Sequence, residues 1–407
     1  MRSASVLVGA WHSIRRNAET SQTAATKQAA RDFAQDLPRN LRRIQDRLRK
    51  GYAFEKAYGA TPAKGVGKVG KRPIVVAPLP DRIVQRAILD VLQDAVDLPN
   101  VQEVLGTPTS VGGIKGRGVD TAIKLFDERH LAGDRFVAGS DISGFFTKIP
   151  RDQVIELLRA DTSEQDFLDL LRAALTVELI NADALGPDER KLFPTGADGV
   201  AQGCPLSALA GNIVLQDFDR QMNDPMRGIS CIRYIDDFIL IGRSRSSVEK
   251  ALGSAKTMLA ALGMDIYDPV QSPKKAFIGE IGEPLVFLGY QIIPGRYPPS
   301  DGACEALLAR VDALVKAGQV SIRKVVKGRP LTTADRCYAQ TLAAIDNTAK
   351  GWRGSFRSSM CEVAFRALDR KIERRMQDFD AFYRSQTKGL DYATRRCALG
   401  VNLLAKP

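Results

Sequence analysis

The stretch Cys231-Ile-Arg-Tyr-Ile-Asp-Asp-Phe-Ile-Leu-Ile-Gly242 places two adjacent aspartates, Asp236 and Asp237, inside an otherwise apolar run. The aliphatic segments on both sides predict a β-hairpin over residues 229–241 that presents the aspartates at a sheet edge. Burial of two neighbouring carboxylates is unfavourable unless cations compensate their charge. An Asp-Asp pair alone is usually a loop or helix-cap feature, so the aliphatic flanks are what indicate a functional site.

A second carboxylate, Asp141, ends the strand predicted over residues 135–141 and is followed by Ile142-Ser-Gly-Phe-Phe146. Aspartates from two neighbouring strands can hold two divalent metal ions about 3.5–4 Å apart, the usual arrangement for phosphoryl transfer. One ion lowers the pKa of an attacking hydroxyl, and the other stabilises the departing pyrophosphate. Oxygen ligands suffice for this chemistry, and the chain has only two histidines, His12 and His130. We therefore expect two divalent metal ions at this site.

The charge of the 407-residue chain, +12 in total, is concentrated at its two ends. Residues 1–72 carry 16 basic and 5 acidic side chains, a net charge of +11, and residues 301–407 carry 20 and 11, a net charge of +9. Residues 73–300 carry 23 basic and 31 acidic side chains, a net charge of −8. This distribution indicates a polyanion held at the flanks, with metal-dependent chemistry in the middle. Solvated helix faces rich in Lys and Arg are the alternative, and charge alone does not separate the two.

The composition excludes several other classes of protein. An apolar fraction of 44% supports a sizeable core, and the length suggests two or three modules. The six cysteines form no Cys-x-x-Cys pair, which argues against a zinc knuckle or a redox pair and favours a reduced, cytoplasmic protein. No run approaches 18 apolar residues, so we expect neither a membrane span nor a membrane partner.

Six motifs carry a resemblance to a known family. Tyr234-Ile-Asp-Asp237 resembles the Tyr-x-Asp-Asp hairpin of reverse transcriptases, and five further motifs stand in that family's order. They are Arg72-Pro-Ile with Asp81-Arg-Ile-Val-Gln-Arg86, Asp141-Ile-Ser-Gly-Phe-Phe146, Gly199-Val-Ala-Gln-Gly-Cys-Pro-Leu-Ser207 continuing to Asn212-Ile213, Pro273-Lys-Lys275, and Phe287-Leu-Gly-Tyr290. Together they cover roughly residues 64–295, and their order and spacing identify the chain as similar to RNA-directed DNA polymerases.

The resemblance implies a role for each catalytic position. The carboxylates of Asp141, Asp236 and Asp237 would hold the two magnesium ions, with the backbone carbonyl of Ile142 completing one coordination shell. Lys275, or its neighbour Lys274, would protonate the leaving pyrophosphate; a surface lysine pair is the alternative.

The resemblance also implies contacts to nucleotide and primer. Phe146 would be the steric gate that collides with a ribose 2′-hydroxyl, with a core aromatic as the alternative. Gln202 and Gly203 would approach the incoming nucleotide and the template base. Arg72, together with Lys71 or Lys68, would hold the triphosphate. Gly289 and Tyr290 would steady the primer terminus, with simple strand packing as the alternative.

The implied fold is an α+β right hand of fingers, palm and thumb, with helices on one face of an antiparallel palm sheet and an all-α thumb. We assign residues 1–134 to N-terminal helices and fingers, 135–150 and 199–297 to the palm, with 151–198 as an insertion, and 298–407 to the thumb. The local patterns predict helices over residues 21–50, 81–97, 151–180 and 246–263, a long helix within 200–223, a strand pair around 275–293, and helices after 303.

Departures from the family pattern narrow the subgroup. Ala201 stands where many relatives have proline, which loosens the loop but leaves Gln202 and Gly203 in place. The 107 residues after residue 300 suffice for a thumb and leave little for maturase or endonuclease parts. Retron and diversity-generating signatures are not found. The chain most resembles stand-alone bacterial enzymes of the defence-associated and abortive-infection groups, which act against phage, often with a structured non-coding RNA.

The sequence therefore predicts an RNA-templated DNA polymerase whose partners are an RNA template, a DNA primer or product, and dNTPs. The oligomeric state stays open. Template-independent or protein-primed DNA synthesis is one alternative, with Tyr338, Tyr383 and Tyr392 as candidate primers. A catalytically silent RNA-binding scaffold and RNA rather than DNA synthesis are the others.

Overall fold

The structure is a computed structural model, and it describes residues 1–407 apart from 22, 65–69, 195 and 402–407. The chain divides into two compact units. The first unit comprises Met1–Lys64 and Val69–Glu280, and the second unit extends from Ile281 to the C-terminus. The division falls earlier in the chain than the predicted end of the palm at residue 297, and the assignment of residues to fingers, palm and thumb stays a prediction.

A five-stranded antiparallel sheet forms the centre of the first unit. Its members are β3 (Phe136–Ser143), β4 (Ile229–Tyr234), β5 (Asp237–Gly242), β6 (Asp265–Ile266) and β7 (Ala276–Glu280). The order is β4-β5-β3, and β6 and β7 pair with different stretches of β3. The predicted strand before Asp141 and the predicted hairpin are both confirmed, and so is the α+β class.

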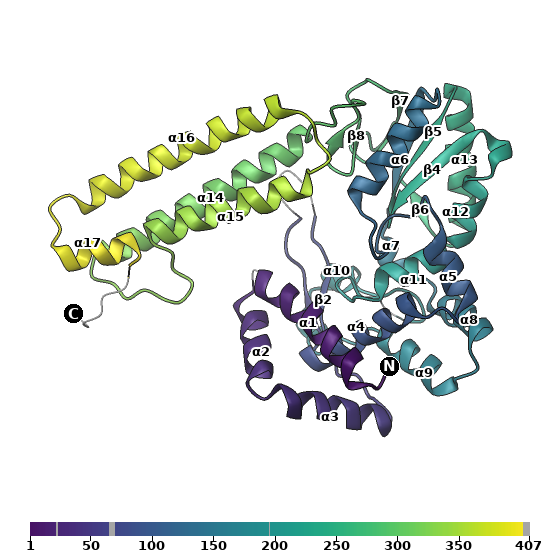
Figure 1. Ribbon diagram of the computed structural model, residues 1–407, viewed down its shortest axis with the longest axis horizontal. Helices are drawn as coiled ribbons and strands as arrows, with labels where there is room; N and C mark the ends of the chain where they lie inside the picture. The colour runs from purple at the N-terminus through teal and green to yellow at the C-terminus, as the bar shows by residue number, and fades with distance from the viewer. Residues whose placement is uncertain (22, 65–69, 195, 402–407) are drawn as a thin grey trace. The chain divides into compact units, whose positions relative to one another are not determined.

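Helices cover both faces of this sheet, whereas the sequence predicted helices on one face. The neighbours Ile239 and Leu240 point to opposite faces, and neither has any exposed surface. Helix α6 (Val119–Leu131) packs against β4 and β5, and α13 (Arg245–Ala261) packs against β3 and β5. Figure 1 shows α6 on one side of these strands and α13 on the other. The error arose because residues 119–131 were not recognised as a covering helix.

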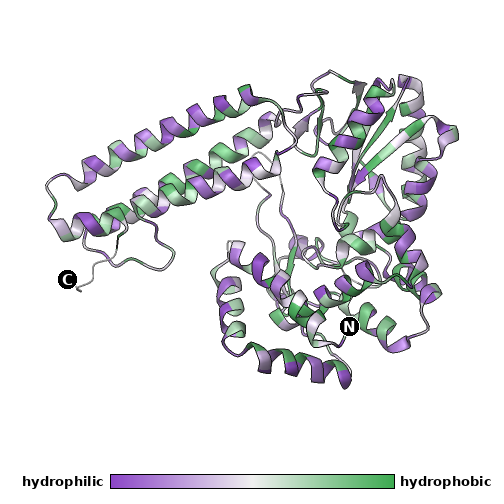
Figure 2. Ribbon diagram, in the orientation of Figure 1, coloured by the Kyte–Doolittle hydropathy of each residue, from purple (hydrophilic) through white to green (hydrophobic). Residues whose placement is uncertain are grey.

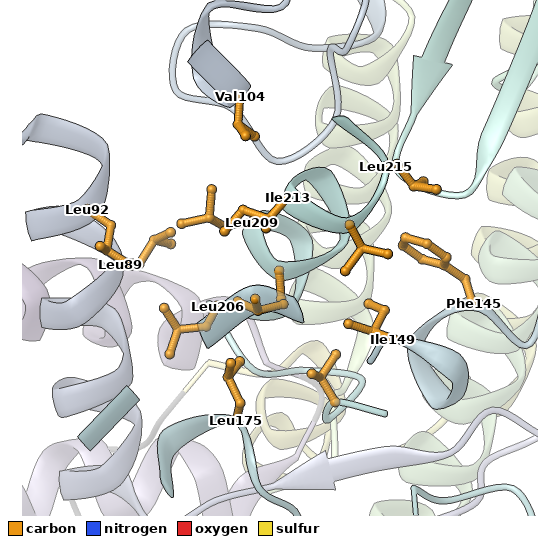
Figure 3. Close-up of a cluster of buried hydrophobic side chains, with 14 of the residues drawn as sticks. Leu89, Leu92, Val104, Phe145, Ile149, Leu175, Leu206, Leu209, Ile213 and Leu215 are labelled. Carbon is orange, nitrogen blue, oxygen red and sulfur yellow. The ribbon is translucent and has the colours of Figure 1, made fainter. Parts of the chain in front are cut away.

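The helix expected within residues 200–223 is two helices, α11 (Ser207–Val214) and α12 (Gln216–Met222), which meet at Leu215. Figure 3 shows Leu209 and Ile213 of α11 between side chains of α4 (Leu79–Asp94) and the pair Phe145 and Ile149. The break lets α12 direct Phe218 at Phe238, with ring centroids 5.7 Å apart, while α11 keeps its apolar face in the core.

The helix predicted over residues 21–50 is also two helices, α2 (Ala24–Gln35) and α3 (Leu37–Arg49), preceded by α1 (Ala4–Thr20). Asp36 between them has a non-helical backbone, and its side chain accepts a hydrogen bond from the Arg39 N–H at 3.4 Å. Pro38 cannot donate a backbone hydrogen bond and suits the first turn of a helix. The chain therefore ends one helix and begins another at this point.

The rest of the first unit connects these parts. Residues 151–180, predicted to be helical, contain two helices, because residues 162–164 between them and residues 176–180 after them are not helical. The remaining elements are β1 (Tyr58–Ala60), β2 (Ile74–Val76), α5 (Pro99–Gly106), α7 (Phe145–Lys148), α8 (Arg151–Asp161), α9 (Gln165–Leu175), η1 (Ala182–Ala184), α10 (Pro187–Arg190) and η2 (Pro225–Arg227). Strands β1 and β2 pair with each other in antiparallel register.

The described residues of the second unit form a short hairpin and four helices. The hairpin joins β8 (Val286–Phe287) to β9 (Tyr290–Gln291), which confirms a strand pair within the predicted residues 275–293. The strand at the start of that range, β7, pairs with β3 instead. The helices are α14 (Asp301–Val326), α15 (Tyr338–Ser355), α16 (Glu362–Thr387) and α17 (Tyr392–Leu399). Figure 2 shows that α16 is hydrophilic along most of its length. Within the described residues, no helix has both the length and the apolar character needed to cross a membrane.

Candidate active site

The candidate site begins at the turn between β4 and β5. Tyr234 pairs with Asp237, so Ile235 and Asp236 form a two-residue loop. Ile235 has φ 62°, a left-handed backbone that β-branched residues rarely adopt. Such a conformation costs on the order of 1–3 kcal/mol and persists only where surrounding contacts determine it. The turn therefore holds Asp236 in one strained, defined arrangement.

Strand β3 brings the third aspartate to the same place. Asp141 stands directly opposite Asp237 in the antiparallel register of β3 and β5. The Ile142 N–H donates to the carbonyl of Asp236 over 2.9 Å, which joins β3 to the turn itself. The three predicted aspartates and Ile142 thus meet at one end of the sheet.

The charges at this end of the sheet influence one another. Burial, reinforced by the negative charge of Asp141, raises the pKa of Asp236 to about 6, and the positive charges of Lys275 and Arg72 oppose the rise. Lys275 forms an ion pair with the Asp141 carboxylate. Burial opposes the charge of Lys275, yet its hydrogen bond to Asp141 raises its pKa above the ordinary value. Two carboxylates and a lysine are therefore coupled at the site.

The donor set fits a hard divalent cation. Asp141 and Asp236 are close enough for one charge to disfavour the other, and carboxylate oxygens are the ligands that Mg²⁺ prefers. Among the residues that the structure describes, no group of three or more acidic, histidine or cysteine side chains is gathered closely enough to hold a metal ion. Asp141, Asp236 and Asp237, with the Ile142 carbonyl, remain the residues that would hold the ions.

The loop containing Gln202 and Gly203 packs against strand β2. The Val75 N–H donates to the Gln202 carbonyl over 3.0 Å. Gly203 has φ +117°, and a Cβ atom there would lie 3.1 Å from the Val75 carbonyl oxygen. Only glycine combines this backbone with so close an approach. Ala201, the departure from the family pattern, is buried, and its carbonyl accepts a hydrogen bond from Ser207 Oγ at 2.7 Å.

The two phenylalanines after Asp141 have different surroundings. Phe145 is buried in the core, and a Cβ atom on Gly211 would lie only 2.6 Å from its ring. Phe146 is half-buried, and its carbonyl accepts a hydrogen bond from the Val200 N–H at 2.7 Å. Phe145 is therefore a core aromatic. Phe146 packs against the same core, with its ring centroid 5.4 Å from that of Phe145, and its backbone is fixed beside the loop that leads to Gln202.

The basic residues predicted to hold the triphosphate are in two different situations. Lys71 forms an ion pair with Glu189, and this hydrogen bond is the main reason that the pKa of Glu189 falls to about 2. Arg72 is exposed, and its charge reaches Asp236. Lys68 lies outside the described residues. Of these three basic residues, Arg72 is therefore the one whose charge is shown to act on Asp236, in addition to that of Lys275.

Gly289 and Tyr290 belong to the second unit. Tyr290 is buried, its ring centroid lies 4.9 Å from that of Phe356, and its hydroxyl donates to the Ser355 carbonyl over 3.1 Å. Gly289 has φ 85° and accepts a hydrogen bond from the Ser300 N–H at 2.8 Å. Tyr290 thus packs within its own unit, and contact of this hairpin with a primer stays a prediction.

Sequence reasoning assigned no role to Arg233, which lies two residues before the strained Ile235. Its guanidinium is fully buried and forms an ion pair with the buried Asp219. Burial opposes its charge, but Asp219 raises its pKa above the ordinary value. A signal was present, because one charged residue in an apolar strand requires a buried partner.

A sequence profile described as reverse transcriptase (RNA-dependent DNA polymerase) matches residues 62–292, more than half of the chain. The chain therefore belongs to the reverse transcriptase family, whose members are RNA-directed DNA polymerases with a right-hand fold. It is similar to Protein YkfC of Escherichia coli (strain K12), with 26% identity over an alignment of 304 residues that covers 63% of this chain and 72% of that protein.

Other matches cover smaller shares of the matched proteins. The uncharacterized 91 kDa protein in cob intron of Schizosaccharomyces pombe is 29% identical over 150 residues, 37% of this chain and 17% of that protein. A solved partial Cas6-RT-Cas1–Cas2 complex has 22% identity and a TM-score of 0.34, covering 64% of this chain and 41% of the other. Apo telomerase from Candida tropicalis has 14% identity and a TM-score of 0.39, covering 61% and 55%. The chain thus spans about half of each of these two solved chains.

Proposed function

We propose that this protein copies RNA into DNA by a two-metal mechanism at Asp141, Asp236 and Asp237. The observation that carries the proposal is the meeting of Asp141 with the strained turn at Asp236, reinforced by the Ile142 hydrogen bond. When bound, two Mg²⁺ ions would supply activation of the primer 3′-hydroxyl and stabilisation of the leaving pyrophosphate. Family membership supports the same chemistry.

The side chains around the aspartates would orient the reactants. The primer 3′-hydroxyl gives up its proton to solvent, and its oxygen forms a bond to the α-phosphorus of the dNTP. The bond from that phosphorus to the oxygen shared with the β-phosphate breaks, and pyrophosphate leaves. Lys275, held by Asp141, would give its proton to that pyrophosphate. Arg72 would bind the triphosphate, and the loop of Gln202 and Gly203 would receive the base pair. Phe146, fixed beside that loop, would exclude a ribose 2′-hydroxyl.

The test is DNA synthesis by purified protein with Mg²⁺, dNTPs and a primed RNA. The double variant Asp236→Ala, Asp237→Ala should abolish synthesis. A matched double variant of two exposed carboxylates, Asp188→Ala and Asp217→Ala, should retain it, since both lie in surface ion pairs. Synthesis by the first double variant would contradict the site assignment. Phe146→Ala should increase incorporation of ribonucleotides, and unchanged selectivity would contradict the gate.

Protein-primed synthesis is a second candidate, favoured by one observation. Among the three tyrosines predicted as primers, Tyr392 is 75% exposed, whereas Tyr383 and Tyr338 are stacked on each other with centroids 4.4 Å apart. The Tyr338 hydroxyl also donates to Asp380 over 2.9 Å. If a tyrosine primes, DNA should be attached covalently to Tyr392 and lost in Tyr392→Phe. Free DNA product from the wild-type protein would exclude this candidate.

The biological role that we propose is defence against phage with an associated structured RNA. Support comes from the resemblance of the motifs to those of bacterial reverse transcriptases of the defence-associated and abortive-infection groups. Phage plating on cells that express the wild-type chain should be reduced, and the Asp236→Ala, Asp237→Ala variant should restore it. Sequencing of nucleic acid that copurifies with the chain would identify the template, and a random mixture of RNAs would argue against a dedicated one.

A further inference from the structure

Arg233 stands next to the catalytic turn and has no part in the chemistry described above. Its guanidinium donates through Nε and Nη2 to the carboxylate of Asp219, with Nε 2.8 Å from Oδ1. Nη1 donates to Asn212 Oδ1 at 3.0 Å and to the Ile235 carbonyl at 2.8 Å, and Nη2 also donates to Ser110 Oγ at 2.8 Å. A guanidinium has five N–H donors, and all five are used here.

One of these bonds fixes the peptide group that precedes Asp236. The Ile235 carbonyl belongs to that peptide and is held by Arg233, while the Asp236 carbonyl, in the following peptide, is held by the Ile142 N–H. Both peptide groups that flank Asp236 are therefore anchored. The direction of a Cα–Cβ bond follows from the backbone on its two sides, so these two hydrogen bonds set where the Asp236 carboxylate can lie.

The segment that carries Ser110 closes on the turn from another direction. The Arg233 N–H donates to the Thr109 carbonyl, and the Val111 N–H donates to the Arg233 carbonyl, both over 2.9 Å. A Cβ atom on Gly112 would lie 2.5 Å from the Ile235 nitrogen, so the segment is in direct contact with the turn. The strained Ile235 is thus held by contacts from outside the hairpin, as such a backbone requires.

We propose that Arg233 is a positioning residue: its buried guanidinium holds the Ile235 carbonyl and thereby orients Asp236 for metal binding and catalysis. The proposal deepens the proposed function and rests on it, since it concerns the same carboxylate. A lysine at position 233 would keep the charge but offers three donors without the planar fork, so it cannot reproduce the set of contacts.

The experiment compares Arg233→Lys with the wild-type protein in two assays. In primed-RNA synthesis, kcat should fall about 100-fold, the loss expected when a reacting group is misplaced by about 1 Å. KM for dNTP should change less than about threefold, because an effect on orientation rather than on nucleotide binding appears in kcat. Mn²⁺ binding without nucleic acid, measured by electron paramagnetic resonance, should weaken at least about tenfold.

Arg129→Lys is the matched control. Arg129 pairs with the buried Asp134 at 2.7 Å, just before β3 begins and away from Asp141. It should lower the free energy of unfolding and leave kcat and Mn²⁺ affinity unchanged. Wild-type kcat and Mn²⁺ affinity in a folded Arg233→Lys protein would overturn the proposal.

A second variant tests whether Arg233 acts through the turn. Glycine adopts a positive φ without strain, so in an Ile235→Gly background the backbone depends less on Arg233. The loss of kcat caused by Arg233→Lys should therefore be clearly smaller in that background, and additive effects would overturn the proposal. If Arg233→Lys does not fold, Ser110→Ala offers a milder change, since it removes one acceptor of Arg233 and the hydroxyl's hydrogen bond to Asn212 Oδ1. It should still lower kcat and Mn²⁺ affinity, and wild-type values for both would overturn the proposal.

The two assays separate the two hypotheses. A wild-type protein that makes no DNA but whose Mn²⁺ affinity falls in Arg233→Lys would contradict the proposed function and support the positioning role. If the wild-type protein and Arg233→Lys both make DNA at the same rate, the proposed function is supported and the positioning role is contradicted.

Discussion

The catalytic end of the sheet and the helices of the second unit differ in how closely the chain approaches itself. Around the sheet, a Cβ atom added to any of several glycines would lie 2.5–2.6 Å from a neighbouring atom; these are Gly112, Gly139 and Gly211. In α14 and α15, other glycines have no such neighbour within 4 Å; these are Gly302, Gly351 and Gly354. Gly318, which faces Thr341 at 2.5 Å, marks a close helix contact in the second unit. Several glycines around the sheet therefore allow close contact between segments, whereas in α14 and α15 such close contact is found at Gly318.

Charge follows the same division. Arg233 and Asp219 are buried together beneath the turn, whereas the ion pairs Arg375–Asp312 and Lys350–Asp346 of the second unit are on the surface. Removal of one partner costs several kcal/mol for a buried pair and about 0–1 kcal/mol for an exposed pair. Substitution of a charged residue beside the site should therefore destabilise the fold strongly. Substitution of a charged residue in the exposed pairs of the second unit should have little effect.

The largest effect that we expect from a single lysine is at Lys275. Lys275→Ala removes the cation that pairs with Asp141 and the proposed proton donor, so the rate of DNA synthesis should fall about 100- to 10,000-fold. Single-turnover kinetics measures this. Lys274→Ala, at the exposed neighbour, is the control and should leave the rate unchanged. Equal losses of rate in both variants would contradict a specific role of Lys275 in the reaction.

A pair of glycine substitutions tests the comparison of the two regions directly. Gly211→Ala should lower the free energy of unfolding by about 1–3 kcal/mol, because the new methyl group meets the buried ring of Phe145. Gly351→Ala in α15 should raise it by about 0.5–1 kcal/mol, since alanine favours a helix and the position is open. Urea denaturation measures both free energies of unfolding. If both variants change it in the same direction, the proposed difference in packing between the two regions is contradicted.

The charged carboxylate of Asp236 should lower the free energy of unfolding at neutral pH, although catalysis requires it. Its pKa of about 6 exceeds the ordinary value near 3.9, so between about pH 4 and pH 6 the folded chain binds more protons than the unfolded chain. The free energy of unfolding contributed by this group therefore rises as the pH falls through that window. At pH 7 Asp236→Asn should be more stable than the wild type by on the order of 1–2 kcal/mol, yet inactive.

Urea denaturation in a chelating buffer at several pH values checks this prediction. The advantage of Asp236→Asn should disappear below about pH 4, where the wild-type carboxyl is protonated in both states. Asp217→Asn, at an exposed carboxylate, is the control and should show no such dependence. A stability difference that does not vary with pH would contradict the raised pKa.

The smallest expected effect concerns Lys71. Glu189→Gln releases this lysine from its ion pair and makes it available to a triphosphate, so KM for dNTP should fall by up to about fivefold. Asp188→Asn, which affects only the surface pair with Lys191, should leave KM unchanged. Steady-state kinetics distinguishes the two. An increase of KM in Glu189→Gln would mean that Glu189 places Lys71 for binding the triphosphate instead of keeping it away from the triphosphate.

The sequence predicted the hairpin and the strand before Asp141 because their signals are local. Aliphatic runs that flank carboxylates identify strand ends without knowledge of distant residues. The break at Asp36 also had a local signal in Pro38, and it was missed because a continuous apolar spacing over 21–50 dominated the interpretation. The break at Leu215 had no such signal, since it arises from packing against the sheet.

The contacts that support the site could not be predicted in the same way. The partners of Arg233 lie 14, 21 and 123 residues away in the sequence, at Asp219, Asn212 and Ser110. The link from Gln202 to Val75 and the pairing of Lys71 with Glu189 likewise depend on the fold. The motifs therefore located the aspartates, whereas the arrangement that holds them became visible only in three dimensions.

The closed set of contacts around Arg233 has a consequence for how this chain can diverge. Replacement of Asp219, Asn212 or Ser110 alone leaves a buried donor without an acceptor, and replacement of Arg233 alone leaves a buried carboxylate without a cation. Each single step is disfavoured even where a new combination of all four would work. We therefore expect these four positions to be inherited as a unit, and lineages that depart from the set to have changed several of its members together.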